Sequence, residues 1–545
     1  MFGADYKMKE RYKILILLAV SGIISGLAVA FSKYVGFLIW VSMIPLFFGL
    51  KLLTDRKALK LRHVYFYGLF YFECFYAVCF HFFLYMYPLD FTGLSNFYSV
   101  LVILIACLGL ALLQAFFGGF AFLVYAITAR GSMAKKFPVV SILSFTAIYT
   151  FYEFTQMLGW WGVPWGRISL AVTDMVIPIQ AASLLGSYFI TAIIVITNAF
   201  LAFALMGDDN KSRNKKYAVA ALSVFVSNIV LGAVLYCSHK SQIKDSETVR
   251  IGVIQGNYDS TDKWFEPAEM IVEKHIALTK KASDEGAEIV LWAETALPFT
   301  LYEDDYFCYE ISFAADELDT TIIVGAMSDI DGGSYNTLFC FTPDGEISET
   351  KYYKRHLVPF GEYVPLRNFM ENTLPFLAEI SMLTDDMVPG KDASLFDMGD
   401  FKAGSLICFD SIYENLTRDT VNSGANLILL STNDSWFSNS AAIYMHNNQA
   451  RFRAVESGRY IARSANTGLS SFISNTGEVI SVLPPLTEDY LCADTVILRY
   501  DTLYSKIGNV FVYLCGIFSL VPLAYDVFYR IKAKKRLQNG ENYDN

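Results

Sequence analysis

The sequence predicts a multi-span α-helical membrane domain joined to an α/β globular domain. The first observation is composition: 54% of the 545 residues are hydrophobic and 18% are charged, with a mean hydropathy of +0.37, which is too apolar for an ordinary soluble protein. The second is that long apolar runs occupy the first 240 residues and one segment near the C-terminus. The third is that residues 250–500 lack such runs and show short β-rich stretches between polar, helix-like segments.

Eight apolar runs predict about eight transmembrane helices. A helix rises about 1.5 Å per residue, so about 20 apolar residues cross the roughly 30 Å hydrocarbon core of a bilayer. The runs are residues 14–31, 35–50, 64–87, 98–129, 139–158, 179–206, 217–237 and 507–528. The limits of the second span stay open. We therefore expect a membrane domain with seven spans over residues 1–240, an α/β domain over 248–500, a C-terminal transmembrane helix over 501–530 and a cytoplasmic tail over 531–545.

The distribution of Lys and Arg predicts the orientation of these spans. Loops on one side of the membrane carry 21 of these residues, whereas the short loops on the other side carry only Lys33 and Arg167. Positive charge marks cytoplasmic loops, so both termini are expected in the cytoplasm and the α/β domain on the outer face. A cleaved signal peptide is the alternative reading of the first run, but no small-residue cleavage site stands out there.

Charge and cysteine content exclude several classes of function. A net charge of −10 argues against nucleic acid as a partner, because phosphate binding needs clustered basic residues. The nine Cys include no C-x-x-C pair, and Cys74, Cys79, Cys107 and Cys515 lie inside apolar runs. Neither a zinc site nor a disulfide framework is indicated. We expect no metal and no cofactor.

Three residues of the α/β domain have the chemistry of a cysteine acyl-transfer site. Cys408 ends an apolar strand, and a thiolate forms thioesters that stay reactive toward amines. Glu294 closes another apolar strand and would serve as its base, while the ammonium of Lys354 would stabilise an oxyanion. Taken singly, each residue fits a structural role as well: a solvated strand end, a surface lysine or a buried cysteine.

Longer motifs surround these three residues. The most specific is the string Tyr352-Tyr-Lys-Arg-His-Leu-Val-Pro-Phe-Gly-Glu-Tyr-Val-Pro365, and others lie at residues 254–257, 263–264, 431–437, 446–459 and 159–165. Together they resemble the apolipoprotein N-acyltransferase family, which uses the Glu-Lys-Cys triad of the nitrilase (carbon–nitrogen hydrolase) superfamily. The resemblance covers nearly the whole chain and is strongest from about residue 152 to residue 490.

The resemblance implies a fold and a role for each site residue. The α/β domain would be a nitrilase-like αββα sandwich. Cys408 would be the nucleophile, Glu294 the general base and Lys354 the oxyanion-stabilising residue. Substrate-binding or supporting positions would be Glu362, Trp264, Phe409, Asp410, Asn433 and Trp436. Among these, Glu362 would orient the lysine or the incoming amine, and Trp264 would shape the access of lipid or peptide.

The chain departs from the family pattern at two places. A Tyr-Glu pair commonly follows the nucleophile, whereas Phe409-Asp410 stands here, and Ala293 replaces a proline before the base. A phenol donor is thereby lost and the carboxylate is one methylene shorter, which leaves the roles of these two residues open. Apolar residues near the site predict either a flap that dips into lipid or a plain core segment: Phe360, Phe369, Met370, residues 374–377, Met382 and Met387.

The function that the resemblance implies is a two-step transfer in the bacterial plasma membrane. A membrane phospholipid would donate a fatty acyl group to Cys408, and the α-amino group of a diacylated apolipoprotein would then accept it. Ping-pong kinetics and a monomeric enzyme are expected. One alternative is a membrane-tethered nitrilase-type amidase that uses water as its second nucleophile. Another is a non-catalytic membrane protein whose α/β domain only binds lipid or another ligand.

Overall fold

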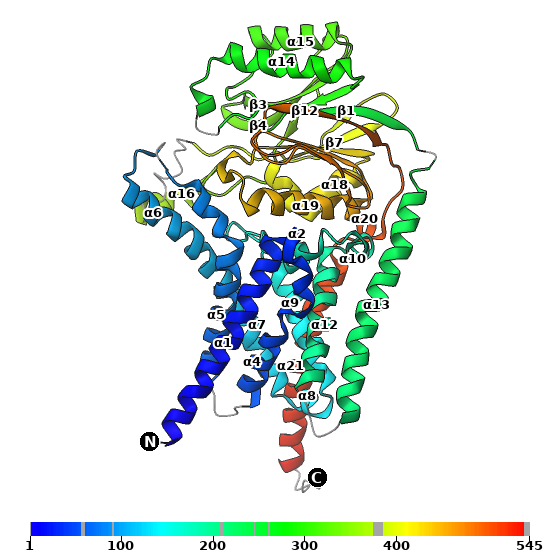
Figure 1. Ribbon diagram of the computed structural model, residues 1–545. Coiled ribbons are helices and arrows are strands. Elements are labelled where there is room, and N and C mark those ends of the chain that lie inside the picture. Colours follow the sequence, from blue (N-terminus) through cyan, green and yellow to red (C-terminus); the bar gives the residue numbers. More distant parts are fainter. Residues whose placement is uncertain are drawn as a thin grey trace. The chain divides into compact units, whose positions relative to one another are not determined.

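The computed structural model describes residues 2–55, 60–89, 92–206, 211–244, 246–259, 262–373 and 385–538 (Figure 1). The chain divides into two compact units. The helical unit comprises Met1–His81, Ile105–Gly232 and Asn509–Asn545. The α/β unit comprises Phe82–Leu104 and Ala233–Gly508. Residues 82–104, which sequence analysis assigned to the membrane domain, thus group with the α/β unit.

Long helices make up the helical unit. They are α1 (Phe2–Ala30), α4 (Ile44–Asp55), α5 (Leu61–Cys79), α7 (Leu110–Ala129), α9 (Val139–Thr155), α12 (Ser187–Leu205), most of α13 (Lys211–Ser241) and α21 (Val510–Gln538). Helix α5 packs against both α1 and α7. The α5–α7 contact is close because Gly68 faces Phe122 and Gly118 faces Phe72, and a Cβ at either glycine would overlap the facing ring.

The prediction of a multi-span helical domain is confirmed, with changes in detail. By length and composition, six segments of the described chain could cross a membrane: Lys9–Ala30, Ser32–Asp55, Asn96–Ala129, Ser187–Leu205, Lys211–Ser241 and Val510–Lys532. The predicted runs 64–87 and 139–158 form α5 and α9, which fall outside these six. The run 179–206 breaks at Gly186, whose φ of 79° is left-handed, so a continuous helix begins only at Ser187.

Two six-stranded sheets form the centre of the α/β unit. The first has the order β12-β1-β2-β3-β4-β5 and the second β11-β10-β9-β8-β7-β6. Bounds in the first sheet are β1 (Thr248–Gln255), β2 (Ile289–Leu291), β3 (Thr321–Ile330), β4 (Gly333–Phe341), β5 (Tyr352–Tyr353) and β12 (Asp489–Val496). Bounds in the second are β6 (Leu395–Asp397), β7 (Lys402–Ile407), β8 (Leu427–Thr432), β9 (Ile461–Ala465), β10 (Ser471–Ile473) and β11 (Val479–Val482). Strands β1-β2-β3 and β7-β8-β9 are parallel.

The two sheets pack face to face and are covered by helices on their outer faces (Figure 1). Side chains of both sheets meet in one buried cluster, for example Leu291 and Ile323 against Ile407 and Leu429. Helices α14 (Ala268–Asp284) and α15 (Tyr306–Glu317) cover the first sheet, and α18 (Glu414–Asn422) and α19 (Ala441–Ser457) cover the second. The αββα sandwich predicted by resemblance is therefore confirmed.

Candidate active site

The candidate site residues follow the ends of strands. Glu294 comes three residues after β2, Lys354 directly after β5, Cys408 directly after β7 and Asn433 directly after β8. Parallel strands buried on both faces read as continuous apolar runs, and their carboxyl ends place loop residues at one edge of the sheet. Four segments that are far apart in the chain are thus brought to one edge of the sandwich.

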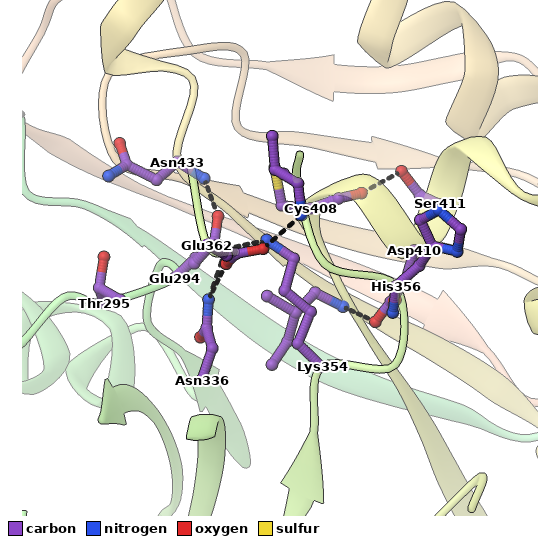
Figure 2. A network of polar contacts seen from close by, with 12 residues as sticks. Glu294, Thr295, Asn336, Lys354, His356, Glu362, Cys408, Asp410, Ser411 and Asn433 are labelled. Carbon is purple, nitrogen blue, oxygen red and sulfur yellow. Dashed lines mark hydrogen bonds and ion pairs between the residues drawn. The ribbon is translucent and has the colours of Figure 1, made fainter. Parts of the chain in front are cut away.

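A buried polar network joins Glu294, Lys354 and Glu362 (Figure 2). Lys354 Nζ donates to Glu294 Oε1 and to Glu362 Oε1, each at 2.8 Å. The other oxygen of each carboxylate accepts a hydrogen bond from a backbone amide. Asn433 N donates to Glu294 Oε2 and Val358 N donates to Glu362 Oε2, each at 2.8 Å. Both carboxylates and the ammonium are buried. Each charge is therefore held in place by at least two partners.

Two negative charges fix the charge state of Lys354. Burial alone would lower the pKa of this ammonium, but the carboxylates of Glu294 and Glu362 outweigh burial and hold the pKa well above its ordinary value. Lys354 therefore stays protonated at neutral pH. A permanent ammonium in a site shielded from water can stabilise an oxyanion that develops next to it.

Cys408 lies on a sharp turn beside this network. Its φ is 46°, in the left-handed region, where β7 passes into the short 3-10 helix η7 (Cys408–Ile412). A nucleophile at a strained strand-to-helix turn presents its side chain above the sheet. Burial raises the pKa of the Cys408 thiol, the charge of Glu294 raises it further, and the ammonium of Lys354 opposes them. The thiol thus needs a base to ionise, and Glu294 is the nearby carboxylate with that capacity.

The turn that carries Glu294 is packed against strand β3. Trp292 N donates to Ile323 O at 2.8 Å and Leu297 N to Gly325 O at 3.1 Å. A Cβ at Gly325 would overlap the carbonyl oxygen of Ala293 and lie 3.0 Å from Glu294 Cα. The absence of a side chain at position 325 thus lets Glu294 lie close to the sheet.

Asp410 connects the turn at Cys408 to the segment around Lys354. Its carboxylate is fully buried. It accepts four hydrogen bonds, from Tyr352 Oη at 2.9 Å, His356 N at 2.7 Å, Arg355 N at 3.2 Å and Ile407 N at 3.1 Å. Sequence analysis left the role of Asp410 open because its side chain is shorter than glutamate. The shorter carboxylate reaches four donors and ties the Cys408 turn to residues on both sides of Lys354.

The other predicted site residues lie at varying distances from this network. Phe409 is buried, with its ring 5.4 Å from that of Tyr413 and 5.7 Å from that of His356. Asn433 contributes its backbone amide to Glu294, and its side chain accepts from Ser435 Oγ at 2.7 Å. Trp264 and Trp436 are partly exposed, at 53% and 38%.

The segment predicted as a flap or a core segment is only partly described. Residues 374–377 and Met382 lie outside the described residues. Phe369 is exposed and Met370 is buried, both in α16 (Arg367–Thr373), while Phe360 and Met387 are half-buried. Backbone bonds join the two ends of this segment, since Met387 N donates to Glu362 O at 2.9 Å.

Sequence reasoning missed two residues of the site. Asn336 on β4 donates from Nδ2 to Glu294 Oε1 at 2.8 Å and to Glu362 Oε1 at 3.0 Å. The sequence signal for Asn336 was its position as a polar residue within the strand 333–341, where it begins the buried half. Lys263 is buried and donates to Thr295 O and Thr295 Oγ1, at 3.0 and 2.7 Å, directly after Glu294. Burial lowers the pKa of Lys263 to about 8, although the charge of Glu294 opposes this.

One cluster in the described chain has the donor types of a metal site. The ligand atoms of Cys408, Asp434 and His446 lie within 4.8 Å of one another. However, Asp434 already accepts from Arg463 Nη2 at 2.6 Å and lies 2.7 Å from His446 Nδ1. Its carboxylate is thus occupied by protein donors, and we assign no metal to this cluster.

Comparisons with known proteins match both units. A family model described as the apolipoprotein N-acyltransferase N-terminal domain matches residues 21–200, and one described as carbon–nitrogen hydrolase matches residues 250–499. The chain is 28% identical over 530 residues to the apolipoprotein N-acyltransferase of Borreliella burgdorferi, covering 93% of this chain and 94% of the relative. It is 29% identical over 382 residues to that of Geobacter metallireducens, covering 69% and 72%. Among solved structures, an amidase from Nesterenkonia sp. is similar at a TM-score of 0.37 and 17% identity, over 50% of this chain and 97% of the amidase.

Proposed function

Because the chain belongs to the apolipoprotein N-acyltransferase family of the nitrilase superfamily, we propose that it acylates lipoproteins in a bacterial plasma membrane. The acyl donor is a membrane phospholipid. The acceptor is the free α-amino group of the diacylglyceryl-modified N-terminal cysteine of an apolipoprotein. The observation that carries this proposal is the buried network of Glu294, Lys354 and Glu362 beside Cys408.

In the first half-reaction Cys408 takes the acyl group. Glu294 removes the thiol proton, and Sγ attacks the carbonyl carbon of the phospholipid ester. The oxyanion of the tetrahedral intermediate is stabilised by the Lys354 ammonium, which the two carboxylates hold in place. As the intermediate collapses, the ester C–O bond breaks and the leaving alkoxide takes the proton from Glu294. The products are an acyl thioester and a lysophospholipid.

In the second half-reaction the acyl group passes to nitrogen. The α-amino group attacks the thioester carbonyl, and the same ammonium stabilises the oxyanion. Glu294 accepts a proton from the attacking amine and returns it to the Cys408 thiolate as the C–S bond breaks. The products are an amide and the free thiol. Separation into two half-reactions through one covalent intermediate gives ping-pong kinetics.

The proposed site belongs to a multi-pass membrane protein. The 21 Lys and Arg on one set of loops, against two on the other, support cytoplasmic termini and an α/β domain on the outer face. In this arrangement residues 248–500 act as the catalytic domain, held by the spans before it and by the helix that follows. A site at the outer leaflet would receive two substrates that both carry acyl chains.

Trapping the intermediate tests the function directly. Purified protein is incubated with isotope-labelled phospholipid and no acceptor, and its intact mass is measured. We expect an acyl adduct that hydroxylamine removes and that Cys408→Ala lacks. Cys492→Ala is the matched control, since Cys492 is another half-buried cysteine of the same unit, and it should keep the adduct. Absence of the adduct in the wild-type protein contradicts the proposal.

Addition of an acceptor separates acyl transfer from hydrolysis. A diacylglyceryl peptide with a free N-terminal amine should remove the adduct and gain the acyl mass. The same peptide with an acetylated amine should do neither. Release of labelled fatty acid at the same rate with both peptides would instead favour the amidase-type alternative, in which water is the second nucleophile.

A further inference from the structure

A buried histidine lies behind the nucleophile turn. His446, in α19, is fully buried, and its Nε2 is 3.2 Å from the carbonyl oxygen of Cys408 and 3.1 Å from Ser411 Oγ. Ser411 Oγ itself donates to that carbonyl at 2.8 Å, as Figure 2 shows. His446 begins the motif at residues 446–459, and the proposed reaction gives this histidine no role. Its contacts with the turn need an explanation.

The orientation of the His446 ring is fixed from its other side. Nδ1 lies 2.7 Å from Asp434 Oδ1, and Arg463 Nη2 donates to Asp434 Oδ2 at 2.6 Å. Burial alone would raise the pKa of Asp434, but the guanidinium of Arg463 and the imidazole of His446 outweigh it and hold the pKa below the usual range. Asp434 is therefore a carboxylate that accepts the Nδ1 proton of His446. This leaves Nε2 facing the Cys408 turn.

The contact at the Cys408 carbonyl controls the direction of the next amide. A peptide unit is planar and trans, so the carbonyl of Cys408 and the N–H of Phe409 point in opposite directions. Anchoring the oxygen through Ser411 and His446 therefore fixes the direction of that N–H. The amide after a nucleophile on such a turn is suited to receive an oxyanion. Cys408 also has a left-handed φ of 46°, which costs free energy unless neighbouring contacts hold it.

We propose that His446 is a positioning residue for the acyl-transfer reaction. Fixed by Asp434, the ring of His446 holds Nε2 within hydrogen-bond distance of the oxygens of Ser411 and Cys408 and so orients the Cys408–Phe409 peptide unit. The amide of Phe409 then acts with Lys354 on the oxyanion of both half-reactions. This inference rests on the proposed role of Cys408 as nucleophile. It assigns the Asp434–His446 pair to the nucleophile turn, separately from the Glu294–Lys354–Glu362 network.

Three substitutions test the role of His446. His446→Leu removes Nε2, whereas His446→Gln keeps an amide donor near the position of Nε2. We expect kcat for adduct formation to fall about 10- to 100-fold in His446→Leu with an unchanged KM for phospholipid, because a misdirected oxyanion donor weakens transition-state binding only. His446→Gln should recover most of that loss. The matched control is His275→Leu, which removes another buried histidine of the α/β unit, one bonded to Ile271 O.

Each outcome bears on the inference. His275→Leu should keep kcat within about 2-fold of wild type, since oxyanion stabilisation is local. Equal kcat values for His446→Leu and His446→Gln would overturn the inference, because volume rather than the donor would then matter. A loss confined to KM, or wild-type activity in His446→Leu, would overturn it as well. Failure of the proposed function looks different, since the wild-type protein would then form no adduct at Cys408.

Discussion

The carboxylates of Glu294 and Glu362 share a neutral donor as well as a charged one. Asn336 Nδ2 donates to one oxygen of each, at 2.8 and 3.0 Å, and the same two oxygens accept from Lys354 Nζ. Asn336 lies on β4 and Lys354 directly after β5, its neighbour in the sheet. Two like charges are thus kept close together by one cation and one amide. The geometry of the proposed base depends on both donors.

Replacing Asn336 should therefore slow the chemistry. In Asn336→Leu each carboxylate loses a hydrogen bond, and a buried charged acceptor left short of a donor costs about 1–3 kcal/mol. We expect the rate of adduct formation at saturating phospholipid to fall about 10- to 100-fold, as for loss of one preorganised donor. Asn336→Asp, of nearly equal size, adds a third negative charge and should lower the rate of adduct formation further. Rates at or near wild type in both variants would show that Lys354 alone suffices.

Lys354 should stabilise the fold as well as the reaction. Lys354→Met leaves two buried carboxylates without their cation, and loss of one partner of a buried ion pair costs about 3–5 kcal/mol. The double variant Lys354→Met with Glu362→Gln removes one of the stranded charges and should recover part of the loss. Urea unfolding of detergent-solubilised protein, followed by tryptophan fluorescence, measures the free energy of unfolding of the single and the double variant. A double variant less stable than Lys354→Met contradicts this account.

The proposed roles of Glu294, Lys354 and Cys408 came from the resemblance of the motifs around them to those of the apolipoprotein N-acyltransferase family, and the structure places each of the three within three residues of the end of a strand. The string around Lys354 also carried Glu362, and the structure places this residue 2.8 Å from the lysine. Asn336 could not be predicted in the same way, since its partner Glu294 is 42 positions away and only strand pairing brings the two together. The fold class followed from hydropathy. The break at Gly186 did not, because one glycine in an apolar run leaves the mean hydropathy nearly unchanged.

Asp410 shows why a motif departure cannot be judged from side-chain length alone. From the sequence alone, the supporting role of a carboxylate one methylene shorter than glutamate stays open. The lysine segment, however, lies close to the nucleophile turn, and the amides of Arg355 and His356 both reach Asp410. Which side-chain length fits depends on this spacing between backbones. Spacing of that kind is set by the packing of the whole sandwich, which local sequence does not encode.

The pH dependence of stability should reveal the buried charge of Asp410. Burial raises its pKa to about 6, with Lys354 opposing, whereas an unfolded aspartate titrates near pH 3.9. The native state then binds the proton more tightly, so ionisation of Asp410 lowers stability as the pH rises from about 4 to 6. The cost persists above pH 6 and amounts to about 2–3 kcal/mol.

Asp410→Asn tests this because asparagine does not ionise. Loss of one acceptor oxygen lowers the free energy of unfolding of the variant by the same amount at every pH. Between pH 4 and pH 6, however, the wild-type protein should lose stability relative to the variant as Asp410 ionises. Urea unfolding at intervals from pH 4 to pH 7.5 measures the difference. Parallel curves over this range would mean that Asp410 titrates alike in the folded and unfolded protein.

Gly325 allows the turn that carries Glu294 to pack closely against strand β3. In Gly325→Ala the new methyl group would overlap the Ala293 carbonyl oxygen and lie 3.0 Å from Glu294 Cα, so the turn after β2 must move outward. Overpacking of this kind costs about 1–3 kcal/mol. Displacement of Glu294 should also lower the rate of adduct formation by about 10-fold or more, since small misplacements of a catalytic group are costly.

The matched control for this substitution is Gly333→Ala. Its methyl group would meet the Val388 Cγ2 methyl at 2.8 Å, and this side chain, unlike a backbone carbonyl, can rotate away. Gly333→Ala should therefore keep nearly wild-type rates. If Gly325→Ala loses stability but keeps its rate of adduct formation, the position of Glu294 is set by its contacts with Lys354, Asn336 and Asn433 rather than by the packing of its turn on β3.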